Sequence, residues 1–131
     1  MSWTNRVIWQ EGMFLRSQHF QQQDRWLEAY LRGRVAALRT HGWGLTQMSL
    51  DRDLLGTGRF AVSSASGVFD DGTPFSLPGE TEHPAPFEVP ENTRGILIHL
   101  ALPVQQAGGI EIAAADGSAE GRYKAHSFEA Y

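Results

Sequence analysis

The apolar residues of this 131-residue chain change their spacing at residues 42–44, which read Gly-Trp-Gly, and this change constrains the fold more than any other feature. On the N-terminal side the spacing is helical, and no proline interrupts residues 18–41. The pattern predicts a helix from about residue 18 to residue 39, with Ser17 as its N-cap. Five apolar residues fall on one line of this helix and predict a face buried against the rest of the fold: Phe20, Leu27, Leu31, Val35 and Leu38.

Beyond residue 44 the apolar residues form short runs separated by turn residues, which is typical of β-strands. We expect strands at residues 45–50, 59–65, 67–69, 74–77, 95–102, 110–114 and 122–131. The run 95–102 has apolar residues on both faces, so we expect a central strand that is covered on both sides. The fold class is therefore predicted to be mainly β, a β-sandwich or partial barrel, with one N-terminal helix.

Turn signals separate several of these strands. Residues 70–73 read Asp-Asp-Gly-Thr and predict a hairpin turn. Four prolines from Pro78 to Pro90 predict an exposed, extended loop. Near the N-terminus, Arg6 to Trp9 suggests a short extended segment that ends in a turn at Gly12.

Length and composition place the chain among single globular domains. Its mean hydropathy is −0.33. The longest apolar run, residues 96–102, contains His99 and is far shorter than the span of about 20 residues that crosses a membrane. The N-terminus lacks the features of a secretory signal, so we expect a cytoplasmic protein. The absence of cysteine excludes disulfides, thiolate nucleophiles and cysteine-type zinc sites.

The charge is distributed unevenly along the chain. Residues 1–50 carry six Arg and three acidic residues, whereas residues 51–131 carry five basic and twelve acidic residues. Ten of the eleven basic residues are Arg, whose planar guanidinium favours paired or interfacial positions. The sequence pI of about 5.7 argues against a nucleic-acid-binding protein, which usually has a dense basic patch.

The residues that could carry chemistry do not form a known catalytic pattern. The five histidines, at positions 19, 41, 83, 99 and 126, lack the spacing that places two imidazoles on one helical face. The pairs Asp51 and Asp53, and Asp70 and Asp71, could bind a cation or act as an acid and base, but short acidic clusters of this kind more often form turns. Phosphate-binding loops and nucleophile elbows are absent as motifs. We therefore expect no enzyme activity and neither a cofactor nor a metal.

The segment from Trp9 to Phe20 mixes polar side chains with large apolar ones, which suits the anchors and rim of a protein interface. The predicted protein-binding residues are Trp9, Met13, Phe14, Arg16, His19 and Phe20. The alternative is that the aromatic residues Trp3, Trp9, Phe14 and Phe20 are buried and hold the helix to the sandwich, and their large apolar area favours that alternative.

Residues 6–25 read RVIWQEGMFLRSQHFQQQDR. This opening of the chain resembles the signature of the TssK family of type VI secretion baseplate subunits. Shorter stretches in the same order are also similar: residues 41–44 (HGWG), 71–75 (DGTPF) with Pro78, 100–103 (LALP) and 122–123 (RY). Ser17 departs from the family pattern, in which proline is expected, and serine can serve there as a cap.

The resemblance implies an N-terminal domain similar to the shoulder domain of siphophage receptor-binding proteins. It implies a structural adaptor that docks onto the wedge built from TssE, TssF and TssG, with TssG as the expected contact. Family members are longer, so we expect residues 1–131 to be this docking domain, truncated at its C-terminal end. Trimer formation and contacts with TssL and TssM would belong to the missing parts. The alternative function is a β-sandwich module that binds a small molecule or saccharide, with Trp43 or the Pro78 to Pro90 loop lining its pocket.

Overall fold

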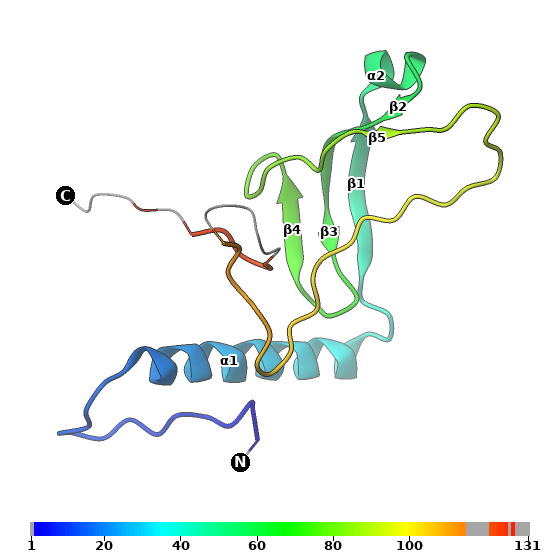
Figure 1. Ribbon diagram of the computed structural model, residues 1–131. Helices are drawn as coiled ribbons and strands as arrows, with labels where there is room; N and C mark the ends of the chain where they lie inside the picture. The colour runs from blue at the N-terminus through cyan, green and yellow to red at the C-terminus, as the bar shows by residue number, and fades with distance from the viewer. Residues whose placement is uncertain (1, 115–120, 126, 128–131) are drawn as a thin grey trace. The chain divides into compact units, whose positions relative to one another are not determined.

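The computed structural model describes residues 2–114, 121–125 and 127. The chain divides into two compact units, the first ending at Gly95 and the second beginning at Ile96. All the helices and named strands of the described residues belong to the first unit (Figure 1). In chain order these are α1 (Ser17–Leu38), β1 (Gly44–Leu50), α2 (Arg52–Gly56), β2 (Arg59–Phe60), β3 (Val62–Val68), β4 (Pro74–Leu77) and β5 (Phe87–Glu88).

The larger sheet is antiparallel, with β3 between β1 and β4. The sequence predicted two strands in the region of β3, but the structure has one, because Gly67 continues the ladder opposite Leu45. The predicted turn between β3 and β4 is confirmed. The backbone N–H of Phe69 donates to the carbonyl of Thr73 at 2.8 Å, and Gly72 has a φ of +87°, a conformation that favours glycine.

The centre of this sheet is closely packed at two small residues of β3. Ala65 is only 1% exposed. A Cβ atom added to Gly67 would collide with the carbonyl oxygen of Gly44 and would lie 3.0 Å from the Cα of Leu45. Close approach of the β1 backbone therefore requires glycine at this position.

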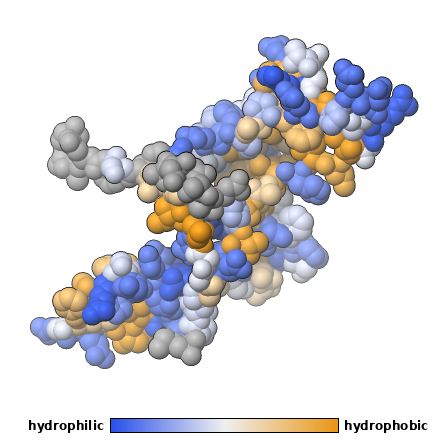
Figure 2. All heavy atoms as spheres, viewed as in Figure 1, coloured by the Kyte–Doolittle hydropathy of each residue, from blue (hydrophilic) through white to orange (hydrophobic). Residues whose placement is uncertain are grey.

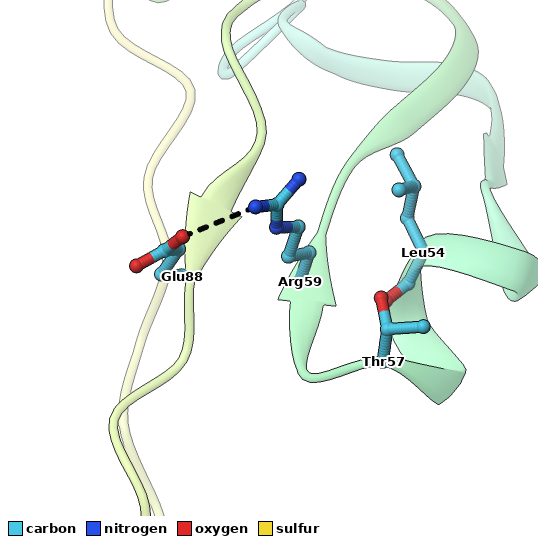
Figure 3. A network of polar contacts seen from close by, with 4 residues as sticks. All are labelled: Leu54, Thr57, Arg59 and Glu88. Atoms are coloured by element: carbon cyan, nitrogen blue, oxygen red, sulfur yellow. Dashed lines mark hydrogen bonds and ion pairs between the residues drawn. The ribbon is translucent and has the colours of Figure 1, made fainter.

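A second, two-stranded sheet pairs β2 with β5. Arg59 lies opposite Glu88, and their side chains form an ion pair at 3.4 Å (Figure 3). Next to β2, the hydroxyl of Thr57 donates to the carbonyl of Leu54 at 2.8 Å and closes helix α2. The proline-rich segment is exposed as predicted, except that its residues Phe87 and Glu88 form β5.

Helix α1 has the predicted length, but its apolar face is not buried. It begins one residue earlier than predicted, with Arg16 rather than Ser17 at the N-cap, and none of its residues is buried. Leu31, at the centre of the predicted core face, is 54% exposed, and Leu27, Val35 and Leu38 are exposed as well. The prediction was wrong because helical periodicity identifies the apolar face of a helix and does not supply an element to cover it.

The strands predicted after residue 95 are also largely wrong. Residues 96–102 form no strand among the described residues, and Leu97 is 83% exposed. Residues 110–114 and 122–125 contribute an isolated parallel bridge, in which Ile112 lies opposite Tyr123. The remainder of the predicted strand 122–131 lies outside the described residues, except for residue 127. A strand requires a neighbouring strand for its backbone hydrogen bonds, and a strand-like pattern of apolar residues does not provide that neighbour.

The fold class nevertheless agrees with the sequence: antiparallel sheets and one long N-terminal helix. Within the part of the chain that the structure describes, no helix is long and apolar enough to span a membrane.

Two glycine-to-alanine substitutions should have opposite effects on stability. Gly33 lies inside α1 with nothing within 4 Å of an added Cβ, so Gly33→Ala should raise the free energy of unfolding by about 0.5–1 kcal/mol. Gly67→Ala should lower it by about 1–3 kcal/mol because the methyl group meets the β1 backbone. Urea unfolding followed by circular dichroism measures both. Equal effects of the two substitutions would contradict the packing described for β3.

Leu31→Ala tests the exposure of α1. A buried leucine would cost about 2–5 kcal/mol, but a half-exposed one should cost less than about 1 kcal/mol. The same unfolding measurement distinguishes the two values. A loss of 2 kcal/mol or more would show that the apolar face is covered in solution.

Candidate functional site

The first residues of the chain form an arm, residues 2–16, that runs back along α1 before turning into it (Figure 1). Two helix side chains hold its backbone. The amide nitrogen Nε2 of Gln22 donates to the carbonyl of Trp3 at 3.0 Å and to that of Asn5 at 2.6 Å. The Nε of Arg25 also donates to the carbonyl of Trp3, at 3.3 Å. The arm is therefore bound to the helix through its main chain.

Arginine and aromatic side chains reinforce this attachment. The guanidinium of Arg25 lies 5.2 Å from the ring centroid of Trp3, and that of Arg6 lies 4.8 Å from the ring of Trp26. Trp26 stacks on Tyr30 with their centroids 5.4 Å apart. At these distances the positive charge interacts favourably with the face of the ring.

The arm turns into α1 at the docking tip, which we define as residues 9–20. Trp9 contacts Phe20 and His19, with ring centroids 5.7 and 6.5 Å apart. On the other side of the turn, the guanidinium of Arg16 lies 5.5 Å from the ring of Phe14. The turn itself is at Gly12, as predicted, with a φ of +78°.

The six predicted binding residues thus lie in one short region. Trp9, His19 and Phe20 form one contact group, Phe14 and Arg16 form another, and Met13 is half-buried. The alternative that these aromatic residues are buried is wrong for Trp9, Phe14 and Phe20, which are exposed, with Phe14 at 77%. Figure 2 shows apolar and polar side chains interleaved at this end of the arm and helix.

His19 has a structural role that the sequence did not indicate. Its ring nitrogen Nδ1 accepts a hydrogen bond from the backbone N–H of Arg16 at 3.1 Å, and its own backbone N–H donates to the carbonyl of Arg16 at 3.0 Å. These two bonds close the first turn of α1. The side chain therefore helps to start the helix, in the manner of the N3 residue of a capping box.

The acidic pairs serve the backbone, in agreement with the favoured interpretation. One carboxylate oxygen of Asp51 accepts the N–H groups of Asp53 and Leu54, both at 3.0 Å, and caps α2. A carboxylate oxygen of Asp71 accepts the N–H of Thr73 at 2.9 Å in the turn after β3. Among the residues that the structure describes, no three His, Asp or Glu side chains are grouped to hold a metal ion.

Sequence reasoning missed the residues that hold the arm. The available signal was the spacing of Gln22, Trp26, Tyr30 and Arg34, which lie four residues apart on one face of the helix. Two of these residues contact each other, since Arg34 donates a hydrogen bond to the hydroxyl of Tyr30 at 3.0 Å. The sequence could not show which arm residues Gln22 and Arg25 contact, because both side chains bind backbone carbonyl groups, which every residue carries.

Comparison with known proteins connects this architecture to bacterial secretion. Over 108 residues the chain is 50% identical to the type VI secretion system baseplate component TssK1 of Pseudomonas aeruginosa PAO1, an alignment that covers 82% of this chain and 24% of that protein. The chain thus spans about a quarter of the length of this relative.

Solved structures share the fold. A crystal structure of TssK matches with a TM-score of 0.83 and 40% identity, covering 94% of this chain and 28% of that one. A TssK-TssF-TssG baseplate subcomplex determined by cryo-electron microscopy matches with a TM-score of 0.70, covering 92% of this chain and 40% of that one. Because the sequence identity in this match is 23%, the match establishes a shared fold and nothing further.

The family match extends over most of the chain. The model of the family described as "Bacterial Type VI secretion, VC_A0110, EvfL, ImpJ, VasE" matches residues 19–131. These findings confirm the resemblance noted in the sequence, and the chain belongs to the TssK family of bacterial type VI secretion proteins.

Proposed function

We propose that this chain is a structural docking domain that attaches a TssK-type subunit to the TssE, TssF and TssG wedge in the cytoplasm, with TssG as its direct contact. The docking tip forms the contact, and no chemical step takes place. In this proposal the whole chain, residues 1–131, serves as the docking domain of a longer subunit.

The exposed docking tip is the observation that carries the proposal. Phe14 and Phe20 present large apolar surfaces beside Arg16 and the half-buried His19. Aromatic anchors next to arginine are the residues that most often dominate protein interfaces. Exposed groups of this kind mark contact surfaces more often than isolated apolar residues do.

Family membership supplies the candidate partners. One structure with this fold is a TssK-TssF-TssG subcomplex, so TssF and TssG are the first proteins to test. Trimer formation and contacts with TssL and TssM are assigned by the resemblance to parts of the longer protein outside this chain, and they remain predictions.

The alternative function, a small-molecule or saccharide site, gains no supporting observation. Trp43 is exposed, and residues 78–88 of the proline-rich loop are exposed throughout. A ligand of that kind is usually enclosed by its site, and side chains this exposed provide little enclosure.

Capture of purified TssF-TssG by the immobilised chain tests the proposal. Phe14→Ala and Arg16→Ala should each weaken capture about tenfold, equivalent to about 1.4 kcal/mol. Their melting temperatures should stay close to that of the wild type, because both side chains are exposed. His19→Ala is less suitable as a test because it also removes the hydrogen bond that starts α1.

Leu38→Ala provides the matched control. Leu38 is an apolar residue of the same helix and is 85% exposed, but it lies at the opposite end of α1 from the docking tip. Capture by this variant should equal that of the wild type. If Leu38→Ala weakens capture as much as Phe14→Ala, or if neither tip variant affects it, the contact lies elsewhere.

A further inference from the structure

The arm has little structure of its own to keep it in place. It forms no strand, and Val7 is its one buried residue among those described. Its internal backbone hydrogen bonds are two turn contacts, from Asn5 to Ser2 and from Met13 to Gln10, both at 3.3 Å. The contacts with Gln22, Arg25 and Trp26 of α1 therefore contribute strongly to the position of the arm.

We infer that Gln22 and Arg25 are positioning residues that fix the arm on α1 before any partner binds, so that the docking tip is presented in one arrangement. This inference rests on the proposed function, because it concerns how the same docking tip reaches its partner. Neither side chain belongs to the docking tip, so their effect on binding would be indirect.

The two side chains orient each other for this task. The Nη2 of Arg25 donates to Oε1 of Gln22 at 2.7 Å, which fixes the orientation of the Gln22 amide. Nε2 of Gln22 is then directed at the arm, where its two hydrogens meet the carbonyls of Trp3 and Asn5. Both groups are partly shielded from solvent, which strengthens such bonds relative to bonds at an open surface.

Arg25 combines two functions that lysine cannot combine. Its Nε binds the carbonyl of Trp3 while its guanidinium lies over the ring of the same residue. A lysine would keep the charge but would lose the planar group that bonds in two directions. We call Gln22 and Arg25, with their bonds to Trp3 and Asn5, the clamp. Arg25→Lys therefore separates the geometry of the clamp from its charge.

A fixed arm matters for affinity because a free arm would have to lose its conformational freedom on binding. Along the chain, the docking tip lies between the arm residues that are held, Trp3 and Asn5, and the helix residues that hold them, so loosening these contacts frees the arm side of the docking tip. The expected result is weaker binding, although every side chain that touches the partner is still present.

The free protein provides the first measurement. Arg6 is held on the ring of Trp26 and is followed by the buried Val7, which should protect the Arg6-Val7 bond from trypsin. Gln22→Ala and Arg25→Lys should speed cleavage at this bond at least fivefold, while the melting temperature changes little. Gln21→Ala and Arg39→Lys are the matched controls, because Gln21 is an exposed residue of the same helix and Arg39 is its exposed C-cap. In both control variants the Arg6-Val7 bond should be cleaved at the wild-type rate.

Binding to TssF-TssG provides the second measurement. Gln22→Ala and Arg25→Lys should weaken capture about fivefold to tenfold. The chain has no cysteine, so a variant carrying Asn5→Cys and Gln22→Cys can be joined at that pair alone by a short bismaleimide. It should bind weakly before the reaction and recover wild-type capture afterwards, which a purely structural defect would not do.

The outcomes separate the inference from the proposed function. Unchanged trypsin cleavage in Gln22→Ala and Arg25→Lys would overturn the clamp. Faster cleavage with unchanged capture would overturn its role in presenting the docking tip. A wild-type chain that captures no TssF-TssG would overturn the proposed function and that presenting role together, and the cleavage rates alone would then decide whether the clamp exists.

Discussion

Strand β3 carries small residues at the centre of the larger sheet, and at Gly67 the backbone of β1 comes so close that only glycine fits. Ala65 is fully enclosed, and Gly67 leaves no room for a side chain against Gly44. The backbone ladder that joins β3 to β1 and β4, together with the close main-chain contact at Gly67, therefore holds the larger sheet together. The start of α2 is held next to this sheet, because the N–H of Asp51, directly after β1, donates at 2.9 Å to the carbonyl of Ala61, directly before β3.

A sheet built on small residues encloses few large ones. The buried apolar residues among those described are Val7, Ala65 and Leu77, which leaves the large apolar side chains of α1 at the surface. The arm and helix are consequently joined by hydrogen bonds to carbonyls and by arginine on aromatic rings. The same shortage of burial leaves Phe14 and Phe20 available to another protein.

Local signals in the sequence predicted the long helix and the turns well. The helix was correct to within one residue at each end, because its period and its stop signals both act over a few residues. The Asp-Gly turn was correct for the same reason, and Asp51 binds nearby backbone N–H groups as expected of a turn former, but the helix that it caps, α2, was not predicted. Contacts between distant segments could not be predicted. Residues 96–102 have the composition of a central strand, but nothing in their own pattern specifies a neighbouring strand, and the pairing of β2 with β5 joins residues almost thirty positions apart.

The sequence predicts an interface at the docking tip from its mixture of residues, but it gave no indication of how this segment is connected to the start of α1. His19 contacts Trp9 at the docking tip and also accepts the N–H of Arg16, so one side chain takes part in both the exposed contact group and the first turn of the helix. A partner that moved Trp9 would disturb the ring of His19, and fraying of the helix start would displace Arg16 and its contact with Phe14. Order at the start of α1 and the arrangement of the docking tip are therefore coupled, and Gln22 and Arg25 restrain the docking tip further by holding Trp3 at the other end of the arm.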